Sequence, residues 1–348
     1  MSVRSQSLPE AQAEAEPSPS LFFETINGFQ RTAALKGAIE LDLFTAIEEG
    51  NATPEAIAVR CQASVRGVRI LCDYLVVAGF LTKNGDGYAL TLDTAMFLNR
   101  HSPAYLGGAL RFLANPMLIE GFQDVAAAVR KGGTVTSPAG TMAAEHPIWA
   151  EFARGMAPLM IMPARLIAKL LNAQTAPKWK VLDIAAGHGM FGITLAQQNL
   201  KAEIVAVDWP HVLEVALENA RQGRVEKRYR TLPGSAFEVK FGGGYDVVLL
   251  TNFLHHFDPA TNEGLLRKVH AAMAPGGRAV ALEFVPNEDR VSPAVAAQFP
   301  LTMLAGTAAG DAYTFAEYQR MFYNAGFSSC ELHELPPTFE RLVVAKKK

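Results

Sequence analysis

The sequence predicts an α/β protein in which a doubly wound, mostly parallel sheet follows a mainly α-helical N-terminal domain built around a winged helix. After Pro177, strand-like apolar runs alternate with amphipathic helical segments, the pattern of parallel strands joined by crossover helices. Residues 53–92 have the pattern of two helices and a short hairpin. The chain has 348 residues, of which 49% are hydrophobic and 19% charged, so it can fill more than one globular unit.

The first 100 residues divide into a tail and a helical domain. Residues 1–20 are rich in Ser, Pro, Glu and Ala and hold almost nothing apolar to bury, so we expect a disordered tail. From Leu21, apolar residues recur at steps of three and four, which predicts helices with an apolar face. Such a face suits packing against a helix of a second copy, and we expect residues 21–100 to form a winged-helix dimerisation domain.

The winged-helix pattern contains its own helix-capping and turn signals. Thr53 and Pro54 suit an N-cap and a first helical position, and NGDG (84–87) suits a hairpin turn. A winged helix can bind DNA through its second helix. Here the basic residues are largely balanced by acids, and the net charge of the chain is −2. We therefore expect neither nucleic acid nor an anionic membrane as a partner.

Residues 101–175 are mainly helical and apolar, and we interpret them as a connector that contributes to an acceptor pocket. Met156 and Met160 lie in this segment; methionines at such positions suit a core, and they also suit a pliable pocket wall. Residues 176–348 then form the predicted sheet domain. Its strand-like runs are VLDIA, EIVAVD, YDVVLLT and RAVALEFV.

Cysteine content and hydropathy indicate the compartment. The three cysteines show no metal-ligand spacing and cannot all pair, which favours a reducing environment and a protein without bound metal. No apolar run approaches the roughly 18 residues of a membrane span, and no signal-peptide pattern opens the chain. We expect a cytoplasmic protein.

The first candidate site feature is VLDIAAGHG (181–189), a strand that runs into a glycine turn before a helix. In such sheets ligands bind at the carboxyl ends of the strands. Gly187 and Gly189 allow a tight turn and a close approach to a ligand. Asp183 would repel a pyrophosphate and suits a ligand with a cationic end, although an ordinary strand–helix turn has the same pattern. His188 is interpreted as part of this loop.

The second feature is Asp208, at the end of the next predicted strand. A carboxylate there can accept hydrogen bonds from both hydroxyls of a ribose, and Trp209 beside it can cover an adenine face. An acid at a strand end also serves as a turn or cap residue. Its spacing from the glycine turn favours the ribose role. Further along, GSAF is expected near the adenine edge, through Ser235, Ala236 and Phe237.

The third feature is NFLHHFDP (252–259), which follows the strand YDVVLLT. Two adjacent histidines at a strand end are unusual core residues. A metal site would need further ligands at suitable spacing, and the sequence offers no convincing set. A general base is the better hypothesis, because imidazole titrates near neutral pH and can accept an acidic proton.

Taken together, these residues resemble the class I S-adenosylmethionine-dependent methyltransferases, specifically the small-molecule O-methyltransferases with an N-terminal dimerisation winged helix. The resemblance extends over nearly the whole chain from Leu21 and implies a Rossmann-like methyltransferase fold. It rests on LFFETINGFQRTAALKGAIELDLF, the winged helix, VLDIAAGHG, AVDWP, GSAF, LHHFDP, PGGRAVALEF and DAYTFAEYQRMFYNAGF.

The resemblance implies S-adenosyl-L-methionine (SAM) as methyl donor and S-adenosyl-L-homocysteine (SAH) as product. The ammonium group of SAM would lie near Asp183 and its ribose on Asp208. His255 occupies the place of the family's general base, and Glu283 that of an acid that orients it. A homodimer is also implied.

The sequence departs from the family pattern beside the base. The acid that usually follows the histidine is replaced by His256, and Ala312 stands where a second orienting acid is expected, next to Asp311. These departures weaken the case for phenol deprotonation by His255. Candidates for the acceptor pocket are Met156, Met160, Phe299, Met303 and His256.

We therefore expect methyl transfer from SAM to a small molecule by in-line displacement, with an aromatic hydroxyl as the first choice of acceptor. Methylation of a small thiol, a nitrogen or a carbon stays open, because a thiol is partly ionised near neutral pH and needs less help from a base. Two alternatives of other classes are a ligand-sensing transcriptional regulator and a catalytically silent partner subunit.

Overall fold

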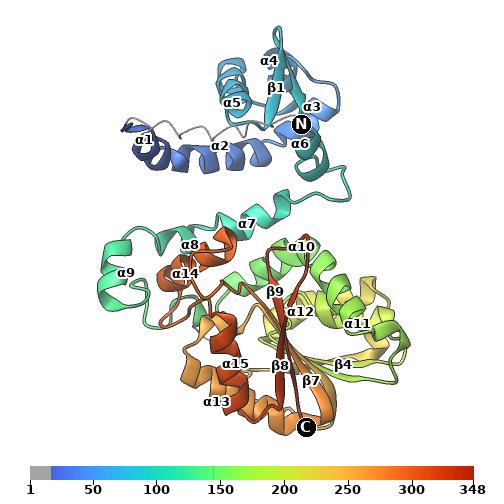
Figure 1. Cartoon of the computed structure of the whole chain (residues 1–348). Coiled ribbons are helices and arrows are strands. Elements are labelled where there is room, and N and C mark those ends of the chain that lie inside the picture. The colour runs from blue at the N-terminus through green and yellow to red at the C-terminus, as the bar shows by residue number, and fades with distance from the viewer. Residues whose placement is uncertain (1–16, 144) are drawn as a thin grey trace, which may run out of the picture. The chain divides into compact units, whose positions relative to one another are not determined.

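The structure is a computed structural model that describes residues 17–143 and 145–348. It contains two compact units, the first ending at Pro103 and the second beginning at Ala104, and each is described by itself (Figure 1). The expected disordered tail lies outside the described residues up to position 16, and the first helix begins at Ser20. Within the described ranges, no helix is both long and apolar enough to cross a membrane.

The N-terminal unit is helical with one small hairpin. Its elements are α1 (Ser20–Ile26), α2 (Gly28–Glu40), α3 (Leu43–Glu48), α4 (Pro54–Arg60), α5 (Val65–Val77), β1 (Leu81–Asn84), β2 (Gly87–Leu90) and α6 (Leu92–Phe97). The hydroxyl oxygen of Thr53 accepts from the Ala56 amide and caps α4, and Pro54 is its first residue. Strands β1 and β2 pair antiparallel across the predicted turn. Helices α4 and α5 with this hairpin confirm the winged helix.

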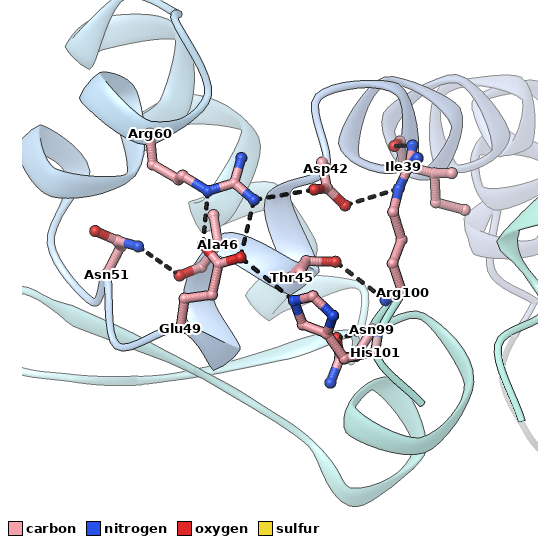
Figure 2. A network of polar contacts seen from close by, with 10 residues as sticks. All are labelled: Ile39, Asp42, Thr45, Ala46, Glu49, Asn51, Arg60, Asn99, Arg100 and His101. Carbon is pink, nitrogen blue, oxygen red and sulfur yellow. Dashed lines mark hydrogen bonds and ion pairs between the residues drawn. The ribbon is translucent and has the colours of Figure 1, made fainter. Parts of the chain in front are cut away.

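Three basic side chains of the winged helix, Arg60, Arg69 and Lys83, are engaged in ion pairs. Figure 2 shows Arg60 of α4 between Glu49, 2.6 Å from its Nε, and Asp42, 3.2 Å from its Nη2. Arg69 and Lys83 both pair with Asp73, at 3.1 and 2.6 Å. These pairs neutralise cations that a DNA-binding surface would need, in agreement with the near-zero net charge.

Helix α1 buries none of its residues. Its apolar side chains and the start of α2 form an exposed apolar face of Leu21, Phe22, Phe23, Ile26 and Phe29. A group of exposed apolar side chains on one face marks an interaction site.

The second unit is built on a seven-stranded sheet of order β5-β4-β3-β6-β7-β9-β8. The strands are β3 (Lys180–Ile184), β4 (Glu203–Asp208), β5 (Tyr229–Pro233), β6 (Tyr245–Thr251), β7 (Met273–Glu283), β8 (Ser329–Glu334) and β9 (Arg341–Lys346). The first five in spatial order are parallel, whereas β9 runs antiparallel to both β7 and β8. The strand order reverses between β3 and β6, so the carboxyl ends of these strands are where a ligand is expected.

Helices cover both faces of the sheet: α10 (Ile148–Leu170), α11 (Met190–Gln198) and α12 (Pro210–Gln222) on one, and α13 (Pro259–Ala272) and α15 (Phe315–Asn324) on the other. The other α-helices of this unit are α7 (Leu110–Leu113), α8 (Pro116–Glu120), α9 (Val125–Lys131) and α14 (Ala294–Gly306). Short 3-10 helices are η1 (Gly107–Ala109), η2 (Gly140–Met142), η3 (Ala173–Thr175), η4 (Glu226–Arg228) and η5 (Leu254–His256). The segment expected to be a connector was residues 101–175, and from Ala104 onward it belongs to the same compact unit as the sheet.

Successive residues of each central strand enter different cores. Val181 packs with α10, α11 and α12, whereas Leu182 packs with α13 and α15. Residues of a strand that is buried on both faces are apolar in succession, which explains the run VVLL (247–250) of β6. The doubly wound, mostly parallel sheet predicted from the sequence is confirmed.

Candidate active site

The turn after β3 is held in a left-handed backbone conformation at alternate residues. Ala185, Gly187 and Gly189 have φ values of 53°, 56° and 74°. A Cβ at Gly189 would also lie 2.6 Å from the hydroxyl oxygen of Tyr229, so only glycine fits this position. The chain leaves the turn directly into α11, as the sequence predicts.

Asp208 fastens this turn to the end of β4. Its Oδ2 accepts a hydrogen bond from the Gly187 amide at 2.8 Å, and its Oδ1 accepts one from the Trp209 amide at 2.7 Å. Burial raises the pKa of Asp208 to about 6, against the effect of these two donors. Each oxygen keeps a lone pair for a further donor.

A cavity of about 190 Å³ opens beside Asp208. It brings together five of the predicted cofactor residues: Asp208, Trp209, Ser235, Ala236 and Phe237. The other lining residues are Met142, Ala185, Val207, Gly234, Phe253 and Phe257. The cavity is therefore a largely apolar slot with one carboxylate at its wall.

Asp183 does not line this cavity. It is fully buried, and its Oδ2 accepts a hydrogen bond from the Gly192 amide in the first turn of α11 at 3.1 Å. Its Oδ1 is buried without a hydrogen-bond partner, and burial raises the pKa of the group to about 8. The side chain thus ties β3 to the start of α11, behind the turn.

His188 is packed inside the turn. Its Nδ1 accepts from the Met190 amide at 3.1 Å, and its ring stacks on Phe152 with centroids 6.0 Å apart. Burial lowers the pKa of His188 to about 4, so the ring is neutral. These contacts agree with its interpretation as part of the loop.

His255 and Glu283 meet in a buried pair at the carboxyl ends of β6 and β7. His255 Nδ1 lies 2.5 Å from Glu283 Oε2. Glu283 Oε1 accepts from the amides of Phe253 and Leu254, at 3.0 and 2.8 Å. Burial lowers the pKa of His255 and raises that of Glu283, which favours a neutral imidazole.

The place of the expected second acid is filled by apolar surface. Ala312 is fully buried. The Asp311 amide donates to the His255 carbonyl oxygen at 2.9 Å, but the Asp311 carboxylate lies 3.6 Å from Arg290 and is partly exposed. Asp311 therefore supports the backbone of His255 and leaves its ring to Glu283.

Several aromatic rings surround His255. Phe299 of α14 lies edge-on to the His255 ring, with centroids 4.8 Å apart, and stacks on Phe284. The His256 ring lies 4.3 Å from that of His255. The structure thus places two of the predicted acceptor-pocket residues beside the candidate base.

The three predicted methionines lie on α10 and α14. Met160 belongs to the core cluster under α10, and Met156 packs against that cluster. The Met160 sulfur lies 3.9 Å from the side-chain nitrogen of Asn252, at the end of β6. Met303 is buried on α14.

Sequence reasoning missed, among other lining residues, Phe253, Phe257 and Met142, and it missed one acid. Phe253 and Phe257 flank the two histidines, so their positions were a usable signal. Met142 follows a loop without periodicity and gave no signal. Glu340, buried immediately before β9, accepts a hydrogen bond from the Asn252 side chain, and burial raises its pKa to about 7.

Glu340→Gln is expected to stabilise the fold at alkaline pH. The pKa of Glu340 is about 7 in the folded state against 4.5 for an unperturbed glutamate, so between these values the folded state keeps a proton that the unfolded chain releases. Stability therefore falls as pH rises through this window, by about 3 kcal/mol in total. The variant should lack this loss in urea unfolding at about pH 5 and pH 8. Equal pH dependence in the variant would contradict the assignment, and the exposed Glu214→Gln is the matched control.

Two family models match the chain: the O-methyltransferase domain over residues 122–328 and the O-methyltransferase dimerisation domain over residues 23–100. The crystal structure of a candidate O-methyltransferase from Nostoc punctiforme is 56% identical, with a TM-score of 0.93 over 95% of this chain and 100% of that one.

More distant relatives agree with these matches. The 3-hydroxy-5-methyl-1-naphthoate 3-O-methyltransferase of Streptomyces sahachiroi is 29% identical over 313 residues, 89% of this chain and 90% of that protein. Human N-acetylserotonin methyltransferase in complex with SAM is 22% identical and shares the fold, with a TM-score of 0.81 over 97% of this chain and 99% of that one.

Proposed function

The chain belongs to the O-methyltransferase family, and we propose that it transfers the methyl group of SAM to a hydroxyl group of a small aromatic molecule. The observation that carries the proposal is the buried His255–Glu283 pair, set among aromatic rings at the carboxyl end of β6. The S. sahachiroi relative, named for methylation of an aromatic hydroxyl, supports the choice of acceptor. None of these relatives supports a transcriptional regulator.

The cavity beside Asp208 fits the adenosine part of SAM. The Asp208 carboxylate has free lone pairs for the two ribose hydroxyls, and Trp209, Phe237 and Phe253 offer apolar surface to an adenine. Ser235 and Ala236 would lie at its edge. Because the slot holds no cationic side chain among its lining residues, it suits a ligand without phosphate.

The glycine turn would hold the amino-acid end of SAM. Gly187 and Gly189 keep its backbone free of side chains, and Asp208 fixes the Gly187 amide. Asp183 contributes indirectly, because its carboxyl group ties α11 to β3 through Gly192. We therefore assign Asp183 a role in holding the loop rather than direct contact with the ammonium group.

His255 is the proposed base. With its Nδ1–H donated to Glu283, the lone pair of Nε2 can take the proton of the acceptor hydroxyl. The neutral imidazole that burial favours is the form that can accept a proton. SAM supplies a methyl group on a sulfonium; the acceptor oxygen forms the new bond to carbon, and the sulfur keeps the electron pair of the broken bond.

A second acceptor class follows from the missing acid. Because Ala312 is buried and the Asp311 carboxylate is directed to Arg290, Glu283 is the one acid among the described residues that pairs with the His255 ring. A thiol needs less base assistance than a phenol. S-methylation of a small aromatic thiol is therefore the alternative, with Met156, Met160, Phe299, Met303 and His256 as the pocket residues in either case.

We further propose that the protein works as a homodimer. The dimerisation domain matched at residues 23–100 supports this, and the exposed apolar face of α1 and α2 is a suitable surface for it.

The direct test combines binding and turnover. In calorimetry we expect SAM and SAH to bind with one site per chain, and with labelled SAM we expect label in phenols of a panel that also holds matched thiophenols and anilines. Transfer mainly to thiols would favour the alternative. If neither SAM nor SAH binds, the proposal that this protein is an enzyme is wrong, and a catalytically silent partner subunit is the better description.

A further inference from the structure

A loop that follows β5 forms one wall of the cavity beside Asp208. Its lining residues are Gly234, Ser235, Ala236 and Phe237, and we call residues 234–237 the cavity loop. The Gly234 amide donates to the Asp208 carbonyl oxygen at 2.9 Å, which fixes the start of the loop. Its end is a local turn, in which the Ser235 carbonyl oxygen accepts from the Val239 amide at 2.9 Å.

The middle of the cavity loop is held by Lys268 of α13. The Lys268 ammonium donates to the Ala236 carbonyl oxygen at 2.8 Å. Among the described residues, this is the one hydrogen bond that joins residues 235–237 to a distant part of the sequence. The same ammonium lies 4.3 Å from the centroid of the Phe241 ring, whose face attracts a cation.

The surroundings of Lys268 show that its charge has a task there. Burial lowers the pKa of Lys268, and the neighbouring Glu238 carboxylate opposes this effect. A partly buried ammonium needs compensation for the water that it loses. The Ala236 carbonyl oxygen and the buried Phe241 ring supply it, so Lys268 is bound to the loop rather than extended into solvent.

The cavity loop offers two backbone donors to a ligand. The amides of Ser235 and Ala236 donate to no acceptor in the described part of the chain, and both residues line the cavity. Adenine has ring nitrogens that accept hydrogen bonds along its edge. Because Lys268 fixes the carbonyl oxygen of Ala236, it also fixes the orientation of that residue and of its amide.

We propose that Lys268 is a positioning residue of the cofactor site, which holds the cavity loop in a conformation that distinguishes adenine from a purine with a different hydrogen-bonding edge. A loop that is ordered before binding loses little entropy when the ligand arrives, so its preorganisation contributes to affinity. This inference rests on the proposed function, since it takes the cavity beside Asp208 as the site of the adenosine part of SAM.

The test compares SAH with S-inosyl-L-homocysteine in calorimetry. Hypoxanthine carries a hydrogen at N1 and an oxygen at C6, where adenine has an acceptor and an amino group, so a fixed loop should reject it. We expect the wild type to bind SAH about tenfold more tightly, the worth of one good hydrogen bond. In Lys268→Met, which keeps an apolar stem without the charge, SAH affinity should fall about tenfold and the ratio of the two affinities should approach one.

Two further variants separate the cation from a general effect on α13. Lys268→Arg should keep the wild-type ratio to within about twofold, because a guanidinium can also donate to a carbonyl oxygen and lie over an aromatic ring. Arg267→Met is the matched control, since this neighbouring cation is exposed and pairs with Glu263 at 3.2 Å. Partial unfolding of a variant would reduce the number of sites for both ligands and leave the ratio of their affinities unchanged. A wild-type ratio near one, an unchanged ratio in Lys268→Met, or an equal fall in Arg267→Met would overturn the inference.

Kinetics give a second readout of positioning. In Lys268→Met the KM for SAM should rise about tenfold, whereas kcat at saturating SAM should stay within about twofold of the wild type. The reason is that the base is held separately, by the contact of His255 with Glu283. A fall in kcat at an unchanged KM would contradict a role in the cofactor site.

The two ligands also separate this inference from the proposed function. If Lys268→Met changes the affinity ratio as expected while no phenol, thiophenol or aniline is methylated, the proposed reaction fails and the role of Lys268 stands. If phenols are methylated and Lys268→Met keeps the wild-type ratio, the reaction stands and the role of Lys268 is wrong.

Discussion

His255→Ala is expected to lower kcat for methyl transfer to a phenol by about 10²- to 10⁴-fold, the usual contribution of a positioned general base. The imidazole is fixed by a 2.5 Å contact from Nδ1 to Glu283, so its removal leaves the acceptor hydroxyl with its proton. SAM binding should persist, because His255 does not line the cavity beside Asp208. The readout is initial rate with labelled SAM at saturating acceptor.

The dependence of the methyl-transfer rate on pH shows whether His255 acts as a base or only helps to position the acceptor. Burial lowers the pKa of His255, so the imidazole stays neutral in the wild-type protein. The rate of methyl transfer by the wild type should therefore not change with pH through the neutral range. In His255→Ala the reaction depends on phenolate present in solution, so the rate should rise with pH toward the acceptor's pKa of about 10. His270→Ala, on α13 against Phe327, is the matched control. A variant that keeps both the rate and the flat profile would show that proximity alone performs the transfer.

Elements with strong local patterns could be predicted from the sequence. The alternating strands and helices, the acid and glycines of VLDIAAGHG and the winged helix each depend on residues close together in the chain. The pairing of His255 with Glu283 spans 28 residues and came from the resemblance, not from spacing. Parallel strands β6 and β7 explain it, because their carboxyl ends lie side by side.

Features that depend on packing between distant segments could not be predicted. Asp183 looked available to a ligand because a glycine turn follows it in the sequence. The position of α11 shows instead that the Gly192 amide donates a hydrogen bond to Asp183 Oδ2. Glu340 had no signal, since its place follows from the register in which Arg341 pairs with Glu283 across β7 and β9. Asp311 was ambiguous until its carboxylate was found beside Arg290.

The turn after β3 is therefore held by two acids with separate tasks. The Asp183 carboxyl group accepts a hydrogen bond from the Gly192 amide, at the start of α11. The Asp208 carboxylate accepts one from the Gly187 amide, in the middle of the turn. Of the two, Asp208 alone lines the cavity. Loss of the Asp183 carboxyl group should loosen the turn. Loss of the Asp208 carboxylate should loosen it too and should also remove the contacts to a ribose.

Asp208→Asn is expected to weaken SAM and SAH binding by about 10²-fold. An amide can accept through one oxygen only, so one ribose hydroxyl and one backbone donor lose a charge-assisted bond, each worth about 1.5–3 kcal/mol. Calorimetry of both ligands measures the loss, and thermal unfolding checks that the fold is intact. Asp246→Asn is the matched control, because its Oδ2 accepts a hydrogen bond from the Lys180 amide at 2.7 Å at the amino-terminal ends of β3 and β6, away from the cavity.

The pH dependence of SAM binding sharpens this prediction. The pKa of Asp208 is raised to about 6 by burial, so the carboxylate that binds both hydroxyls is present above that pH and is lost by protonation below it. Wild-type affinity should therefore fall between about pH 7 and pH 5, by up to tenfold per pH unit, and Asp208→Asn should lack this dependence. SAM binding within twofold of wild type in Asp208→Asn would place the ribose elsewhere, and with it the adenosine site at the end of β4.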